Sequence, residues 1–202
     1  DFAYVVFVLG LIMAMVGSRI FHVLEYLPQY RGDVGRALAG AGFSWYGGLL
    51  FAAVSTIWVA RTKKIHWAPF VDSVSPTLAI GYGFGRVGCF LSGDGCYGPP
   101  CAALGLNWSA PFCMAFPNGG VPTTDLVFNT PVFEIAGSTV LFAYLMIVRR
   151  RVTTHALLFA QMIIIHAVMR FGIEFVRINP PLALGMSQAQ WLSLVCVGIG
   201  AY

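Results

Sequence analysis

Charged side chains are scarce in this chain. Only 10% of the 202 residues are Asp, Glu, Lys or Arg, and 58% are hydrophobic, whereas a soluble domain carries roughly 25% charged residues. This composition excludes an ordinary soluble domain and predicts a membrane protein. The net charge of +4 does not indicate a nucleic-acid-binding surface, because half of the basic residues stand in two short clusters beside apolar runs.

Apolar runs long enough to cross a hydrocarbon core of about 30 Å recur along the chain. We expect six membrane-spanning helices, near residues 2–27, 43–60, 67–90, 132–148, 155–175 and 187–202. The predicted fold is an all-α polytopic bundle that forms a single integral membrane domain over residues 1–202. Because the chain begins at Asp1 without a Met and ends within an apolar run, we expect it to be a piece of a longer chain, from which at least one more helix is missing.

Lys and Arg are absent from the long segment 92–130, whereas basic clusters follow the second and fourth apolar runs, at 61–64 and 149–151. Loops rich in Lys and Arg stay on the cytoplasmic side of a membrane. The pattern therefore places both clusters in the cytoplasm and predicts that residues 92–130 form a small cap on the outer side.

Metal-binding patterns are also missing. Four of the five cysteines, Cys89, Cys96, Cys101 and Cys113, fall on the predicted outer side, where an oxidising compartment permits disulfides. Their spacing does not reveal the connectivity. The spacing is not that of a zinc site, and no pair of histidines accompanies it. We therefore expect no metal and no cofactor.

Ionisable residues nevertheless occur within the predicted spans, where each costs roughly 2.5 to 3.5 kcal/mol and persists mainly where it pairs or functions. They lie toward the outer ends of their spans: Arg19, His22, Arg86, Asp94, Glu134, His166, Arg170, Glu174 and Arg177. The spacing of His166, Arg170 and Glu174 puts them on one helix face. A salt bridge between Arg170 and Glu174 that ties helices together is one interpretation, and a functional site is the other.

The stretch GYGFGRVGCFLSGDGCYG at 81–98 contains a formal G-x-G-x-x-G with Arg86 inside it. A dinucleotide fingerprint needs a preceding strand and a βαβ unit, and neither is expected within a membrane span. So many glycines predict a helix broken near the outer interface, beside a cavity lined by arginines. Arginine binds phosphate through bidentate hydrogen bonds, so we expect the phosphate of a lipid.

Five segments, in order along nearly the whole chain, resemble one family: GSRIFHVLEYLPQY at 17–30, FSWYGGLL at 43–50, GRVGCFLSGDGCYG at 85–98, TPVFE at 130–134 and MRFGIEFVR at 169–177. The family is that of the prolipoprotein diacylglyceryl transferases, whose signature usually reads G-R-x-G-N-F-x-N-G-E. The resemblance implies a seven-helix bacterial inner-membrane enzyme, of which the first helix is absent from this sequence. Its substrates are phosphatidylglycerol, which donates the diacylglyceryl group, and the lipobox cysteine of a prolipoprotein signal peptide, which receives it.

The resemblance also implies residue roles. Arg86 and Arg170 hold the lipid phosphate, and Asp94 stands at the signature glutamate. The remaining positions expected to bind substrate are Arg19, Cys89, Ser92, Gly47, Gly48, Glu134 and Glu174.

Several positions depart from the family pattern. Tyr46 replaces the histidine of the F-H-G-G segment, Cys89 replaces the signature asparagine and Phe133 replaces the tyrosine of the Y-E pair. His166 stands where the family usually has a tyrosine. We therefore hypothesise that histidine and tyrosine have exchanged sides of the pocket, so that His166 is the base and Tyr46 a hydrogen-bond donor.

Three alternatives remain at this point: a catalytically inactive phospholipid-binding relative, a transferase with a different acceptor, and an anion transporter. The transporter is the least favoured. Transporters show internal repeats and place their charges near the membrane midplane, whereas this chain has no repeat between its halves and its charges lie toward the outer leaflet.

Overall fold

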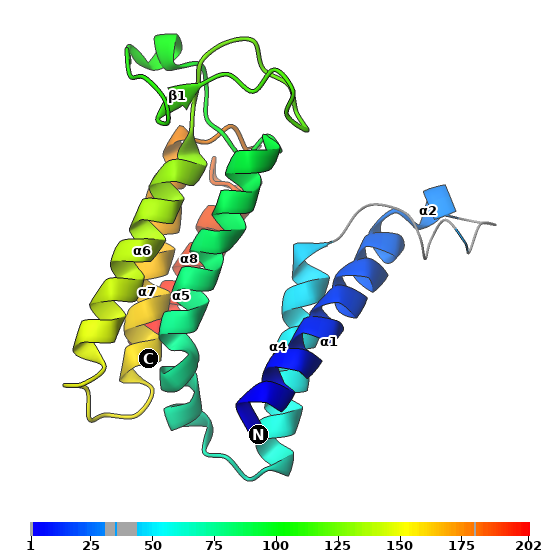
Figure 1. The fold of residues 1–202 in the computed structure, drawn as a ribbon, viewed down its shortest axis with the longest axis vertical. Coiled ribbons are helices and arrows are strands. Elements are labelled where there is room, and N and C mark those ends of the chain that lie inside the picture. The colour runs from blue at the N-terminus through cyan, green and yellow to red at the C-terminus, as the bar shows by residue number, and fades with distance from the viewer. Residues whose placement is uncertain (1, 31–34, 36–43, 180) are drawn as a thin grey trace. The chain divides into compact units, whose positions relative to one another are not determined.

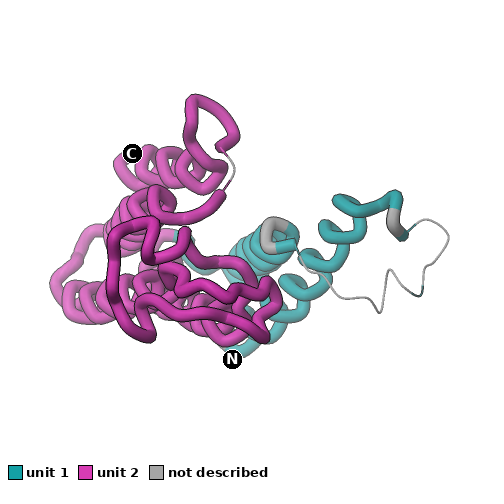
Figure 2. Tube along the Cα trace, turned by 90° about the horizontal axis from the view of Figure 1, so that it is seen from above, with its two compact units in different colours: residues 1–67 teal, residues 68–202 magenta. Residues whose placement is uncertain are grey.

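The computed structural model describes the chain except for residues 1, 31–34, 36–43 and 180. The described residues form two compact units, residues 1–67 and residues 68–202, which are drawn in teal and magenta in Figure 2. Each unit is described by itself below. The single integral membrane domain expected from the sequence stays a prediction.

The first unit is a pair of long helices with a short helical turn. Helix α1 spans Phe2–Glu25, α2 spans Leu27–Tyr30 and α4 spans Trp45–Thr62. Helices α1 and α4 approach closely where Gly17 faces Gly47, because a Cβ atom added to either glycine would collide with the backbone oxygen of the other. Small residues permit such contact between membrane helices.

The second unit contains four helices that run alternately up and down (Figure 1). They are α5 (Trp67–Ser92), α6 (Thr130–Val148), α7 (Leu157–Ile173) and α8 (Gln188–Ala201), and the 3-10 turn η2 (Glu174–Val176) extends α7. Their core is a cluster of buried apolar side chains: Ala79, Leu141, Leu145, Leu158 and Met162. Large apolar side chains such as Leu78, Val140, Ile147 and Val168 lie exposed on the outside of the bundle.

At the start of two helices in this unit, side chains accept hydrogen bonds from backbone N–H groups. Asp72 of α5 accepts hydrogen bonds from the backbone N–H groups of Ala156 (2.7 Å) and Phe159 (2.9 Å), at the start of α7. Ser187 and Gln190 form a capping box at the start of α8. The first four N–H groups of a helix lack partners within the helix, so these side chains supply them.

Helix α5 runs without interruption through Gly81, Gly85 and Gly88 and ends at Ser92. The break predicted from these glycines is therefore wrong. Conformational freedom is instead used just after the helix, where Gly93 and Gly95 have φ of +56° and +87°, a region that L side chains rarely adopt.

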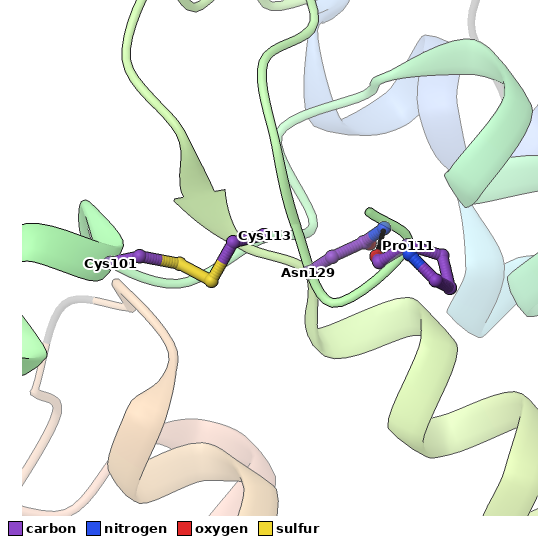
Figure 3. Close-up of a disulfide and its surroundings, with 4 residues drawn as sticks. All are labelled: Cys101, Pro111, Cys113 and Asn129. Atoms are coloured by element: carbon purple, nitrogen blue, oxygen red, sulfur yellow. Dashed lines mark hydrogen bonds between the residues drawn. A yellow bond between two sulfur atoms is a disulfide. The ribbon is translucent and has the colours of Figure 1, made fainter. Parts of the chain in front are cut away.

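A small cap lies at the end of the bundle where α5 ends and α6 begins (Figure 1). It contains the 3-10 turn η1 (Cys101–Leu104) and a two-stranded antiparallel sheet of β1 (Cys113–Met114) and β2 (Val127–Phe128). Cys113 pairs with Phe128, and Met114 with Val127. A disulfide joins Cys101 to Cys113, and the Asn129 side chain donates a hydrogen bond to the Pro111 carbonyl (2.8 Å; Figure 3). Residues 92–130 thus contain a small folded cap, and its location on the outer side of a membrane stays a prediction.

Among the residues that the structure describes, three helical segments are long and apolar enough to cross a membrane: Tyr4–Glu25, Thr130–Val148 and Leu157–Val176. Shorter apolar helices cover Gly47–Thr62 and Gln188–Ala201. Together with α5, every expected span corresponds to a helix in the described part of the chain. The apolar helices and their exposed apolar side chains are those of a membrane protein, and the prediction of an all-α bundle with a small cap is confirmed.

Candidate functional site

Glu134 is the centre of a charged cluster in the second unit. It is fully buried in the second turn of α6. Its carboxylate lies 3.4 Å from Nε of Arg86 on α5 and 3.7 Å from Nη1 of Arg170 on α7. The hydroxyl of Tyr82 donates a hydrogen bond to the same carboxylate. One glutamate therefore joins three helices just below the cap.

A second carboxylate contacts Arg170. Nη1 of Arg170 lies 2.8 Å from Oε2 of Glu174. The other carboxylate oxygen of Glu174 accepts a hydrogen bond from the Asn179 side chain at 2.5 Å. The i, i+4 pair expected on this helix is present, and it belongs to a larger network in which two arginines face two glutamates. A buried charge is tolerated only when it is paired, and this set is neutral overall.

The arginines are less deeply buried than the glutamates. The side chains of Arg86 and Arg170 are 17% and 15% exposed, whereas those of Glu134 and Glu174 are 0% and 2% exposed. The carboxylates thus contact the guanidinium groups from the buried side, and part of each arginine side chain stays accessible. Such an arrangement presents fixed positive charge to an anionic ligand.

His166 contacts this cluster through an aromatic neighbour. Its ring meets the Tyr82 ring edge to face, with centroids 4.4 Å apart, and Arg86 lies over the same tyrosine ring at 4.8 Å. The sequence analysis missed Tyr82. The signal that would have found it is spacing, because Tyr82 precedes Arg86 by one helical turn and shares its face of α5.

A second group of polar side chains lies where α5 enters the cap. Nη1 of Arg86 is 3.7 Å from Sγ of Cys89 and 3.6 Å from Sγ of Cys96, and Nη2 of Arg177 is 2.9 Å from Sγ of Cys96. Asp94 accepts a hydrogen bond from the backbone N–H of Cys96 at 3.1 Å. Arg86 thus belongs to both groups.

The cap environment changes the protonation of two of these groups. Partial burial opposes ionisation of Asp94, but hydrogen bonds from Cys89 and Cys96 outweigh it and lower the pKa of this carboxyl. A hydrogen bond from Cys89, together with the charge of Arg177, lowers the pKa of the Cys96 thiol to about 7 against the effects of burial and of Asp94. Arg177 and Cys96 were not among the expected site residues.

The other predicted site residues are separated by unit. Ser92 is exposed at the end of α5, where its hydroxyl bonds to the Cys89 carbonyl (3.3 Å). Arg19, Gly47 and Gly48 belong to the first unit. Their convergence with the second unit's arginines stays a prediction. The side chain of Tyr46 lies outside the described residues.

Within the first unit, Gly48 lines a groove of about 650 Å³ between α1 and α4, with Ala14, Met15, Ser18, Ser44, Leu49 and Ala52. Arg19 stacks over the Tyr30 ring at 5.5 Å. These residues therefore combine an apolar groove with a cation near the ends of α1 and α4.

Comparison with known proteins gives a consistent result. The family model for prolipoprotein diacylglyceryl transferase matches residues 1–202. The phosphatidylglycerol–prolipoprotein diacylglyceryl transferase of Geobacter sulfurreducens is 33% identical over 190 residues, which cover 92% of this chain and 68% of the relative. That of Leptospira interrogans is 27% identical over 245 residues, covering 96% of this chain and 76% of the relative. That of Dehalococcoides mccartyi is 28% identical over 190 residues, covering 92% and 69%. The chain therefore belongs to the prolipoprotein diacylglyceryl transferase family.

Proposed function

We propose that this protein transfers the diacylglyceryl group of phosphatidylglycerol to the lipobox cysteine thiol of prolipoproteins, as a multi-pass protein at the outer side of the bacterial inner membrane. The names of its relatives support both substrates. The observation that carries the proposal is the cluster in which Arg86 and Arg170 converge on buried Glu134.

The two arginines bind the phosphate of the donor lipid. The acceptor thiolate attacks the glyceryl carbon next to the phosphate, a C–S bond forms, and the C–O bond to the phosphate breaks. The electron pair stays on the phosphate oxygen, so glycerol 1-phosphate leaves. Guanidinium groups fixed beside that oxygen stabilise the charge that develops on it.

Glu134, Glu174 and Tyr82 position the arginines. Glu134 contacts both guanidinium groups and accepts a bond from Tyr82, whereas Glu174 contacts Arg170 alone. A preorganised set of charges needs no rearrangement when the leaving group becomes anionic. Without these glutamates, the arginines would repel each other and turn toward water.

The acceptor thiol must lose its proton, because the thiolate is the nucleophile. We assign to His166 the role of the base that accepts this proton, because it lies beside Tyr82 at the edge of the arginine cluster. We assign to Tyr46 the role of a hydrogen-bond donor. Asp94, Ser92 and Cys89 lie where α5 meets the cap and would contact the donor headgroup or the signal peptide. Arg19, Gly47 and Gly48 of the first unit complete the substrate-binding set.

Genetic complementation tests this proposal. The full-length protein is expressed in a bacterium whose own diacylglyceryl transferase is under a repressible promoter, and growth and lipoprotein modification are scored after repression. Wild type and Arg149→Ala, a change of an exposed arginine at the far end of the bundle, should restore both. Arg86→Ala should restore neither although it is present in the membrane. Equal rescue by Arg86→Ala would refute the assigned role.

The replacement of the family histidine by Tyr46 favours one second candidate, a phospholipid-binding relative without transfer. The two functions differ in one measurement. If wild type fails to restore lipoprotein modification but co-purifies with phosphatidylglycerol, and Arg86→Ala loses that lipid, the binding function replaces the transferase.

A further inference from the structure

Two free cysteines lie together at the junction of α5 and the cap. Cys89 is in the last turn of α5, and Cys96 follows in the loop that turns at Gly93. The two Sγ atoms and a carboxylate oxygen of Asp94 all lie within 4.8 Å of one another. Both thiols are partly exposed, and neither belongs to the Cys101–Cys113 disulfide.

The charges around the pair distinguish its two sulfur atoms. Nη1 of Arg86 is nearly equidistant from both, 3.6 Å from Sγ of Cys96 and 3.7 Å from Sγ of Cys89. The difference comes from Arg177, whose Nη2 atom lies 2.9 Å from Sγ of Cys96. A cation at this distance favours the thiolate form, which is the reactive form of cysteine. Cys89 is within hydrogen-bond reach of both Cys96 and the Asp94 carboxylate. Cys96 is thus placed as a nucleophile, and Cys89 has a proton acceptor beside it.

We propose that Cys89 and Cys96 form a redox-active thiol pair that closes to an intramolecular disulfide by exchange with a disulfide-containing oxidant. The Cys96 thiolate attacks one sulfur of the oxidant, forms a mixed disulfide and releases the first thiolate. Cys89 transfers its proton through Asp94 to that thiolate and attacks the Cys96 sulfur. The second thiolate of the oxidant then leaves, so two thiols are oxidised and one disulfide is reduced.

The same residues fit a divalent cation less well. A metal ion on the Cys96 sulfur would stand beside the guanidinium groups of Arg177 and Arg86, which already supply the positive charge. Disulfide formation instead removes the thiolate and leaves Arg86 with one anionic neighbour fewer. The thiol pair thereby connects the redox state of the cap to an arginine of the charged cluster. This inference does not depend on the transferase activity.

Oxidation of the wild-type protein tests the proposal directly. The full-length protein in detergent, with a chelator present, is incubated with oxidised glutathione, and the remaining thiols are blocked with N-ethylmaleimide. A digest without reductant is then analysed by mass spectrometry. We expect a cross-linked peptide that joins Cys89 to Cys96 as the main product, while Cys196 of α8 carries the maleimide. Maleimide on both Cys89 and Cys96 at the level of the untreated control would overturn the proposal.

The role of Arg177 as the counter-ion of the Cys96 thiolate is tested with a matched pair of variants. At pH 7 the Arg177→Gln protein should form the mixed disulfide roughly tenfold more slowly than wild type, because a larger fraction of Cys96 is protonated. Arg149→Gln, far from the thiols, should react at the wild-type rate. The unfolding midpoint of each variant is recorded to show that it is folded. An unchanged rate in folded Arg177→Gln would overturn the assignment of Cys96 as the activated thiol.

Discussion

At the scale of single residues, Glu134 explains why two arginines remain together within an apolar bundle. Its carboxylate contacts Arg86 and Arg170 and accepts a hydrogen bond from Tyr82, and it is completely shielded from solvent. The carboxylate is placed to compensate both guanidinium groups, and its removal leaves two cations with too little compensation. The geometry of the candidate site therefore depends on this residue.

Replacement of Glu134 by glutamine should destabilise the protein strongly. The amide keeps the shape and can still accept a bond from Tyr82, but it cannot neutralise the arginines, so we expect a loss of about 3 kcal/mol in the free energy of unfolding. Denaturation in mixed detergent micelles measures this value. Asp125→Asn, which changes an exposed carboxylate of the cap, should unfold like wild type. If Glu134→Gln changed the free energy of unfolding as little as Asp125→Asn does, the ion pairs of Glu134 would not stabilise the packing of the helices.

The protonation of Cys96 predicts how its reactivity depends on pH. Its pKa is lowered to about 7 by the hydrogen bond from Cys89 and the charge of Arg177, while burial and Asp94 oppose the shift and Arg86 also lies beside the sulfur. Alkylation of Cys96 by iodoacetamide should therefore be half-maximal near pH 7 and fall below it as the thiolate gains a proton. Peptide mass spectrometry follows the reaction, with Cys96→Ser as background. A midpoint above roughly 8.5, the value of an unperturbed thiol, would contradict this account.

The sequence predicted these residues unequally. Arg86, Arg170, Glu134 and Glu174 stood out because charges within apolar runs are costly and need a reason. The Arg170–Glu174 pair followed from the spacing of the two residues. The contacts of Glu134 with arginines on other helices could not be predicted, because they depend on the rotation of each helix about its axis, which composition does not determine. The cluster at Cys96 was missed because the turn at Gly93, which brings Cys96 back toward the end of α5, follows from loop geometry.

At the scale of elements, the second unit is joined by contacts near both ends of its helices. Tyr82, Arg86, Glu134 and Arg170 connect α5, α6 and α7 at the end next to the cap. At the other end, Asp72 of α5 caps the start of α7. The sequence placed Asp72 near the start of a span but carried no sign of its partner, which lies more than 80 positions away in the chain.

Loss of the Asp72 carboxylate should weaken this second connection. Asp72→Ala leaves the N–H groups of Ala156 and Phe159 without their acceptor, so we expect a loss of about 1 to 2 kcal/mol, as for other helix caps. Ser73→Ala serves as the control, because Ser73 is exposed and its hydroxyl donates a hydrogen bond to the Pro69 carbonyl of its own helix. Thermal unfolding of the three proteins in the same detergent gives the comparison. If Asp72→Ala and Ser73→Ala have the same unfolding midpoint, the hydrogen bonds from Asp72 to the start of α7 contribute nothing to stability.

The wrong prediction at this scale concerns the glycines of α5. Their number suggested a broken helix, since each interior glycine costs about 1 kcal/mol relative to alanine. The helix is continuous because its backbone hydrogen bonds must be satisfied internally within a membrane. The need to satisfy the backbone hydrogen bonds therefore outweighs the weak local preference of glycine.

At the scale of the whole molecule, the distribution of charge matches the arrangement of the second unit. The cap lies at one end of its helices, and Arg149, Arg150 and Arg151 follow α6 at the other end (Figure 1). Helix number and the position of the cap were predictable from apolar runs and from the absence of Lys and Arg over residues 92–130. The small sheet within the cap was not predictable, because its strands contain two residues each. The exact boundaries of the elements were not predictable either.

The positive-inside rule predicts an orientation in which the cap lies on the outer side of the membrane and Arg149, Arg150 and Arg151 lie in the cytoplasm. A cysteine introduced at Asn118 in the cap should react with a membrane-impermeant maleimide in spheroplasts, whose inner membrane is intact. A cysteine introduced at Arg150 should react only after the membrane is opened. Both positions are exposed in the structure, and mass spectrometry of the labelled peptides separates them from the native cysteines. Labelling of both sites from the same side would contradict the proposed topology.

The transfer reaction itself is the most direct test of the central claim, that the arginine cluster around Glu134 supports diacylglyceryl transfer. The full-length protein is placed in phosphatidylglycerol liposomes with a lipobox peptide, and the diacylglyceryl thioether is measured by mass spectrometry for wild type, Arg86→Ala and Arg149→Ala. The account predicts product from wild type and Arg149→Ala, and at least a hundredfold less from Arg86→Ala, in keeping with the loss of one electrostatic stabiliser. Product at the wild-type rate from folded Arg86→Ala, or no product from wild type, would contradict it.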